Sequence, residues 1–191
     1  MLPLILIGCV ILAIALFVLI TYNRLVRMRL ACRNSWAQIE VALKLRHDLV
    51  PNLVGAVSGY ATHERTTFER TAEARSAAVA AVGSGPAARG AVEGALATGI
   101  GNLIGVAEAY PELKASENFG ALQRELASVE ERISITRRVY NDTVETLNTA
   151  VAVFPQSVVA SAFGFRAREF FTAEAEVHVA PTVELGGGTA R

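Results

Sequence analysis

The polar groups that could do chemistry stand together at one place, where Arg46, His47 and Asp48 follow one another just before a proline. A histidine beside a carboxylate is a combination used in metal sites and in acid–base catalysis. On a helix, however, adjacent side chains diverge by about 100°, so the histidine and the aspartate would point in different directions. We interpret the triplet as a polar patch that fixes the register of a helical bundle, with a ligand site as the alternative. Arg46 would then need a carboxylate partner, for which Glu130 and Glu131 are candidates.

The sequence contains no motif of a known enzyme active site. His47, His63 and His178 lie far apart, and no glutamate precedes a histidine at the Glu-x-x-His spacing of di-iron bundles. The patterns H-E-x-x-H and G-x-S-x-G are absent, and neither Cys9 nor Cys32 has a histidine nearby. We therefore predict no catalytic residue, no cofactor and no metal. A metal-dependent hydrolase hidden in the bundle is the last of three hypotheses.

An apolar run at the N-terminus is long enough to cross a bilayer as a helix. Residues 2–20 carry no charge. Four arginines follow with no acidic residue among them: Arg24, Arg27, Arg29 and Arg33. Such a cluster marks the cytoplasmic end of a span and can contact an anionic leaflet. We predict a single-pass inner-membrane protein with a short N-terminus outside and the helical domain in the cytoplasm.

The same run could be a removable signal, but two features favour an uncleaved anchor. Only Met1 precedes the run, so the basic segment of a signal peptide is missing. Residues 6–9 resemble a lipoprotein cleavage box, yet the apolar run continues well past Cys9.

Composition limits the remaining possibilities. Lysine plus arginine and aspartate plus glutamate both number 18, so the chain has no net charge. Nucleic-acid binding therefore has little electrostatic support, and we expect no nucleic-acid partner. Without the anchor, about 170 residues remain, which is enough for one domain with a substantial core.

Between residues 21 and 82 the sequence predicts a long helix that packs lengthwise on others. Apolar residues recur every seven positions in two series, interrupted only by Arg29 and Arg46. One series is Tyr22, Trp36, Leu43, Val50 and Val57; the other is Leu25, Cys32, Ile39, Leu53 and Tyr60. Pro51 either kinks this helix or breaks it into two.

The next segment is a turn at residues 83–90 followed by a helix over 91–109, which Pro111 ends. Four glycines weaken this helix, and we expect them to allow close approach to a neighbouring helix: Gly94, Gly99, Gly101 and Gly105.

The most regular heptad pattern belongs to the last long helix. Its members are Phe119, Leu126, Ile133, Tyr140, Leu147 and Phe154. They predict a helix of 36 residues, about 54 Å long, capped by Ser116 or Asn118 and closed by Pro155. A short amphipathic helix or hook should follow, and then a loose tail over residues 172–191.

The chain resembles the LemA family of small bacterial membrane proteins over residues 22–171. The resemblance rests on several motifs in order: Tyr22-Asn23, Trp36-Ala37-Gln38-Ile39, Arg46-His47-Asp48-Leu49-Val50-Pro51-Asn52-Leu53-Val54, Ala109-Tyr110-Pro111-Glu112-Leu113-Lys114-Ala115-Ser116-Glu117-Asn118-Phe119, Val139-Tyr140-Asn141, Phe154-Pro155 and Phe163-Gly164-Phe165. The Gly- and Ala-rich stretch over 79–101 and the tail depart from the family pattern.

The resemblance implies an N-terminal transmembrane helix followed by a long antiparallel helical bundle, without an established enzymatic activity. One branch of the family takes part in building the magnetosome membrane compartment. We therefore expect an all-α chain with an anchor (1–21), a bundle of three to four helices (22–171) and a tail (172–191). Residues expected to have structural or interaction roles are Arg46, Pro51, Asn118, Tyr140, Phe163 and Phe165.

Two functions fit these expectations. The first is a membrane-anchored, non-catalytic scaffold that binds lipid and other membrane or cytoplasmic proteins, including copies of itself. The second is membrane remodelling by self-assembly, with aromatic side chains of the hook touching lipid or a neighbour: Phe163, Phe165, Phe170 and Phe171. The hook would return to the membrane if Pro51 breaks the first helix, and would lie at the distal tip if it does not.

Overall fold

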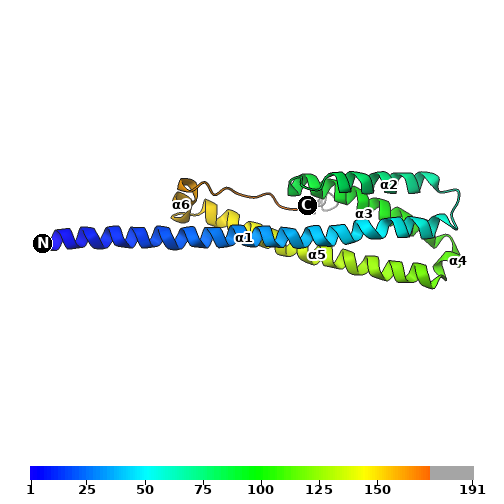
Figure 1. Cartoon of the computed structure of the whole chain (residues 1–191), viewed down its shortest axis with the longest axis horizontal. Helices are drawn as coiled ribbons and strands as arrows, with labels where there is room; N and C mark the ends of the chain where they lie inside the picture. Colours follow the sequence, from blue (N-terminus) through cyan, green and yellow to red (C-terminus); the bar gives the residue numbers. More distant parts are fainter. Residues whose placement is uncertain (173–191) are drawn as a thin grey trace, which may run out of the picture.

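The structure is a computed structural model that describes residues 1–172, and every regular element among them is an α-helix. The elements are α1 (Leu2–Ser58), α2 (Arg65–Ala80), α3 (Pro86–Glu108), α4 (Pro111–Lys114), α5 (Glu117–Ala152) and α6 (Gln156–Ala162). The predicted all-α fold, with an apolar N-terminal helix leading into a helical bundle, is confirmed (Figure 1). Apart from Thr172, the predicted tail lies outside the described residues.

A single helix, α1, forms both the apolar stem and the first helix of the bundle. It has 57 residues and is therefore about 85 Å long. The apolar window at its start is only 6% buried, and Figure 1 shows this part projecting alone beyond the other helices. Further along, the predicted seam is buried, with Leu25, Ile39 and Leu43 fully enclosed. Stem and bundle are thus one continuous rod.

Among the described helices, α3 is the other one long and apolar enough to cross a membrane. One third of its apolar window is buried, because Leu96, Ile100 and Leu103 pack inside the bundle against α2 and α1. The apolar character of α3 therefore has an explanation within the core.

The first helix does not break at Pro51. It continues to Ser58, and the chain reverses over residues 59–64. Of the two alternatives at Pro51, the break is therefore wrong. The expectation that an unbroken helix would leave the hook at the distal tip is also wrong, because the reversal at 59–64 supplies the missing turn.

The long helices alternate in direction along the rod. As Figure 1 shows, α1 leads away from the stem, α2 returns, α3 leads away again and α5 returns. The α2–α3 turn contains Gly83 at φ +89°, a conformation that glycine adopts without strain. The four-helix arrangement brings α6 back beside α1 near the stem.

The boundaries of α3 and α5 follow from local sequence signals. α3 begins at Pro86, five residues before the predicted start, because proline at the first helical position loses no hydrogen bond. α5 has the predicted 36 residues but is shifted by two positions toward the N-terminus. Its cap is Ser116, whose hydroxyl accepts a hydrogen bond from the Phe119 amide at 3.5 Å. Asn118, the alternative cap, is exposed in the first turn.

The buried apolar residues form two clusters along the rod. The stem-side cluster joins α1, α5, α6 and the C-terminal segment, and the distal cluster joins α1, α2, α3 and α5. At Gly99 a Cβ atom would lie 3.3 Å from the Thr71 hydroxyl, so this glycine lets α2 and α3 approach closely. Gly101 and Gly105 have nothing within 4 Å of that position, so the expectation of close approach is wrong for them.

Candidate functional site

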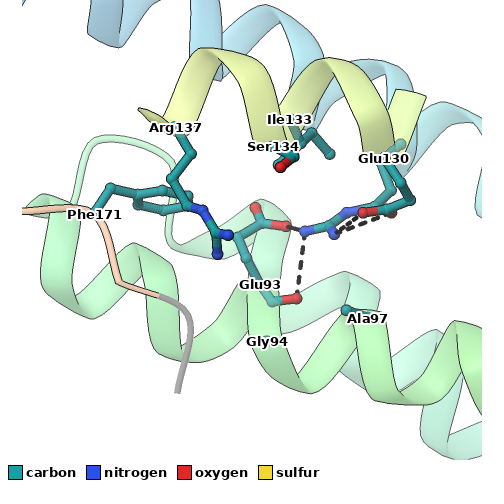
Figure 2. A pocket seen from close by; sticks show the side chains of 9 residues that line it. Glu93, Gly94, Ala97, Glu130, Ile133, Ser134, Arg137 and Phe171 are labelled. Atoms are coloured by element: carbon teal, nitrogen blue, oxygen red, sulfur yellow. Dashed lines mark hydrogen bonds and ion pairs between the residues drawn. The ribbon is translucent and has the colours of Figure 1, made fainter. Parts of the chain in front are cut away.

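A group of buried charges lies between the two apolar clusters. Arg46 occupies a seam position of α1, and its side chain is 4% exposed. Its guanidinium donates to the Glu93 carboxylate at 2.5 Å and to the Glu130 carboxylate at 3.2 Å. Figure 2 shows the two carboxylates approaching from α3 and α5. One arginine therefore connects three helices.

Glu93 is the centre of this group. It is 2% exposed and also contacts His47 Nε2 at 2.9 Å and Arg89 Nε at 3.1 Å. The Arg89 contact lacks the direction of a hydrogen bond, because that Nε atom has no acceptor of suitable geometry among residues 1–172. We name Arg46, His47, Arg89, Glu93 and Glu130 the buried charge cluster.

The electrostatics of the cluster favour an ionised Glu93. Burial opposes ionisation of its carboxyl, but hydrogen bonds and positive charge from His47 and Arg46 outweigh this effect. The pKa of Glu93 therefore lies below the ordinary value of 4.5. The buried carboxylate of Glu93 is thus paired with basic groups and hydrogen-bonded, which is the condition under which a buried charge is tolerated.

The sequence predicted part of this cluster. It placed Arg46 in the seam and named Glu130 as a partner, and both residues meet; Glu131 is exposed instead. It missed Glu93 and Arg89, which lie in the stretch that departs from the family pattern. Their signal was an oppositely charged pair at i, i+4 within an otherwise apolar helix.

The chemistry available to the cluster is limited, because the Glu93 carboxylate is fully engaged by basic side chains. Both oxygens of Glu93 already face basic groups, so neither is free to act as a general base. Residues 1–172 hold no group of three or more His, Cys, Asp or Glu side chains that could bind a metal. A cavity of about 160 Å³ adjoins the cluster, and Figure 2 shows Ser134, Arg137 and Phe171 around it. This geometry is suited to fixing the register of α1, α3 and α5 relative to one another. That role stays a prediction.

Pro51 has a specific partner in the structure. A proline inside a helix leaves the carbonyl four residues earlier without its amide donor, and here that carbonyl belongs to His47. Arg75 of α2 takes the place of the missing donor, because its Nε donates to the His47 carbonyl oxygen at 2.8 Å. The proline therefore creates an acceptor through which α2 is attached to α1.

This contact can be tested by a double-mutant cycle. Arg75→Ala should lower the free energy of unfolding by about 1–3 kcal/mol, because the part-buried carbonyl loses its partner. In a Pro51→Ala background, residue 51 regains its amide and bonds to that carbonyl, so Arg75→Ala should cost little. Denaturant titrations followed by helical circular dichroism measure both differences. Equal losses in the two backgrounds would contradict this role for Arg75.

A C-terminal strap, residues 163–172, runs along the bundle and is held by polar side chains of α5. Asn141 clamps the Phe171 backbone with two hydrogen bonds of 3.0 and 3.2 Å, and Asn148 does the same to Arg168 at 2.8 and 2.9 Å. These asparagines are seven residues apart and so share one face of α5. Tyr140 donates its hydroxyl to the Glu169 carbonyl at 2.9 Å, and burial raises the pKa of Tyr140 above 10.0. The predicted core tyrosine therefore has the partner that its hydroxyl requires.

A model of the LemA family matches residues 35–185. The chain belongs to the LemA family. Its relatives include magnetosome proteins MamQ 2 and MamQ 1 of Paramagnetospirillum magneticum, each 26% identical over 178 residues, and MamQ of Magnetospirillum gryphiswaldense, 25% identical. Each alignment covers 80% of this chain and 65% of the relative, so the LemA-family chain spans less than two thirds of their length.

The stem end of this LemA-family chain holds the residues predicted to contact membrane. Arg24, Arg27, Arg29 and Arg33 are all exposed. The Arg29 guanidinium lies 5.1 Å from the centre of the Phe165 ring, which is a cation–π geometry.

The aromatic side chains of the hook divide into two pairs. Phe163 and Phe170 are exposed, at 54% and 43%. Phe165 and Phe171 are buried, at 7% and 2%. The hypothesis that all four touch lipid or a neighbour is therefore wrong for Phe165 and Phe171, which belong to the core.

Proposed function

We propose that this LemA-family protein is a membrane-tethered, non-catalytic scaffold, whose bundle lies on the cytoplasmic side and presents helical surfaces to protein partners or to copies of itself. One observation carries the proposal: α1 joins the exposed apolar stem to the bundle without a break. Membership of the LemA family and the exposed apolar stem both support membrane association. A bundle fixed to its anchor by one helix keeps its surfaces at set heights above the membrane, as a scaffold requires.

The surface between α1 and α5 is the proposed binding surface for a protein partner. Ile135 and Val139 are 54% and 44% exposed there, although both are large and apolar. Val139 also lines a groove with Met28 and Ala31. Exposed apolar side chains beside a groove are a feature of protein-binding surfaces.

Photo-crosslinking in intact cells tests the scaffold. A benzophenone amino acid at Val139 should give discrete crosslinked species, whereas the same label at Tyr60, which is 45% exposed on the α1–α2 turn, should give far fewer. Pull-down of the crosslinked species identifies the partner. A monomer in native membranes and in detergent, with no crosslinked or co-purifying protein, would contradict the scaffold.

A reporter fused to the C-terminus tests the proposed orientation. It should be active only inside the cell; activity only outside would overturn the orientation.

Membrane remodelling by self-assembly is the second candidate. It is supported by the return of α6 to the stem and by the names of the relatives, which are magnetosome proteins. If it holds, the purified protein should assemble on liposomes and deform them, and deletion of residues 156–171 should abolish both. Because that deletion also removes two core phenylalanines, Phe165 and Phe171, retained helicity must be shown alongside.

A further inference from the structure

We infer that the corner between α5 and α6 is a second membrane contact, which places apolar side chains in the headgroup region of an anionic bilayer beside the anchor. The inference rests on the proposed tether and adds the surface that fixes how the bundle sits on the membrane.

The corner lies level with the end of the stem. Tyr22 follows the apolar run almost directly, and its ring is 5.0 Å from that of Phe163. Val18, inside the run, packs against the cluster that includes Val159 and Ala160 of α6. Figure 1 shows α6 beside α1 at this level. A bilayer that holds the stem therefore has its surface next to α6.

The corner exposes large apolar side chains that the fold does not use. The exposed fractions are 52% for Val153, 77% for Phe154, 61% for Val158 and 54% for Phe163. All four lie within eleven residues of sequence, around the short helix α6. Val159 and Ala160, on the other face of α6, are buried. A short helix with one face in the core, an exposed valine on the other and exposed phenylalanines just beyond its two ends is suited to a membrane interface.

The charges around the corner favour anionic lipid over a protein surface. Residues 2–39 and 146–168, at the stem end, contain six arginines and no Asp, Glu or Lys: Arg24, Arg27, Arg29, Arg33, Arg166 and Arg168. Glu145 and Glu169 border the second range, and Glu145 lines a groove with Arg24 and Val153. All 18 acidic residues lie elsewhere in the chain, so zero net charge conceals a strongly basic end. Arg24, about 6 Å past the apolar run, would lie near the height of lipid phosphates, and Arg33, about 20 Å past it, would act on the leaflet only through the longer-range field.

A fluorescent label on the corner tests this directly in the full-length protein. Phe154→Cys is labelled with NBD in a Cys9→Ala background; Cys32 is fully buried and does not compete. The matched control is Tyr60→Cys in the same background, at the distal turn, where Tyr60 is 45% exposed. Both proteins are reconstituted in vesicles of phosphatidylcholine and phosphatidylglycerol with a trace of lipid that carries a nitroxide near its headgroup.

We expect nitroxide lipid to quench the label at residue 154 and iodide in the buffer to leave it bright, with the reverse at residue 60. Replacing phosphatidylglycerol by phosphatidylcholine should weaken the nitroxide quenching. A label at 154 that iodide quenches as strongly as the control would overturn the inference. Shielding from both quenchers would also overturn it, because it would assign the corner to protein contact. Carbonate extraction distinguishes failure of the two proposals. If carbonate extracts the protein from the vesicles, the proposed tether is contradicted. If the protein is retained but the label at residue 154 is exposed to water, only the corner contact is contradicted.

Discussion

Replacing Glu93 by alanine should destabilise the bundle by about 3–5 kcal/mol, the usual cost of leaving a buried charge without its partner. Arg46 would keep Glu130, whose side chain is 39% exposed, and the backbone carbonyl of residue 93 as acceptors, whereas Arg89 and His47 would lose their carboxylate. Since whole domains are stable by about 5–15 kcal/mol, this one change would remove a large part of the total. Chemical unfolding in detergent, followed by circular dichroism, measures the loss.

The matched control is Glu131→Ala, which removes an exposed glutamate from α5 and should change stability by less than about 0.5 kcal/mol. Losses of equal size at the two positions would refute a special role for the cluster.

The acid dependence of stability gives an independent test of the same group. Because the pKa of Glu93 is lowered in the folded protein, its ionised form stabilises the fold above pH 4.5, and this contribution is lost as the pH falls through the lowered pKa. Glu93→Gln should therefore flatten the fall in stability below pH 4.5. An unchanged acid profile would show that the carboxylate charge contributes little.

Replacing Phe171 by alanine should release the strap from the bundle while the helices remain. Phe171 is 2% exposed, and its ring lies 5.6 Å from that of Trp36. Truncating a buried phenylalanine costs about 3–5 kcal/mol, which exceeds the contribution of the few hydrogen bonds that hold the strap end. Trp36 is the single tryptophan of the chain, so its emission should shift to the red as water reaches it. Circular dichroism should change little.

Phe170→Ala is the control for that experiment, because Phe170 is 43% exposed and should leave the emission where it is. Gly90→Ala offers a second route to the same state, since an added Cβ would collide with the Thr172 carbonyl oxygen. If Trp36 keeps its emission in both Phe171→Ala and Gly90→Ala, the strap does not shield it.

Much of this fold was readable from hydrophobic periodicity. The seven-residue spacing from Phe119 to Leu147 predicted the length of α5, because a helix in a bundle must keep one apolar face along its whole length. The uncharged run and the arginines after it predicted the stem, because the hydrocarbon core of a bilayer requires an apolar helix and the headgroup region favours basic residues beside it.

The position of the first turn was not readable in the same way. Pro51 is a strong local signal against helix, but its cost is met by Arg75, which lies more than twenty residues further along the chain. The real turn at 59–64 has weaker signals, and the heptad series continues to Tyr60 as if the helix did not end. Whether the helix continues at Pro51 and where it ends depend on contacts between helices, which a local sequence pattern does not reveal.

Only part of the buried charge cluster could be predicted from the sequence, again because the rest depends on tertiary contacts. Arg46 stood out as a charge in an apolar seam, which makes a partner necessary without naming it. Its strongest partner, Glu93, lies in a Gly- and Ala-rich segment whose composition drew attention to packing rather than to charge. Which carboxylate faces which arginine depends on how α3 is set against α1, and this follows only from the folded bundle.

The absence of a joint within α1 gives the bilayer a mechanical influence on the far end of the rod. If the stem spans the bilayer upright, the part of α1 beyond residue 20 extends about 57 Å from the membrane surface. If the span leans by about 20° to match a thinner bilayer, the distal turn swings sideways by about 20 Å. A change in membrane thickness would thus change the lateral position of the distal turn and of any partner bound there.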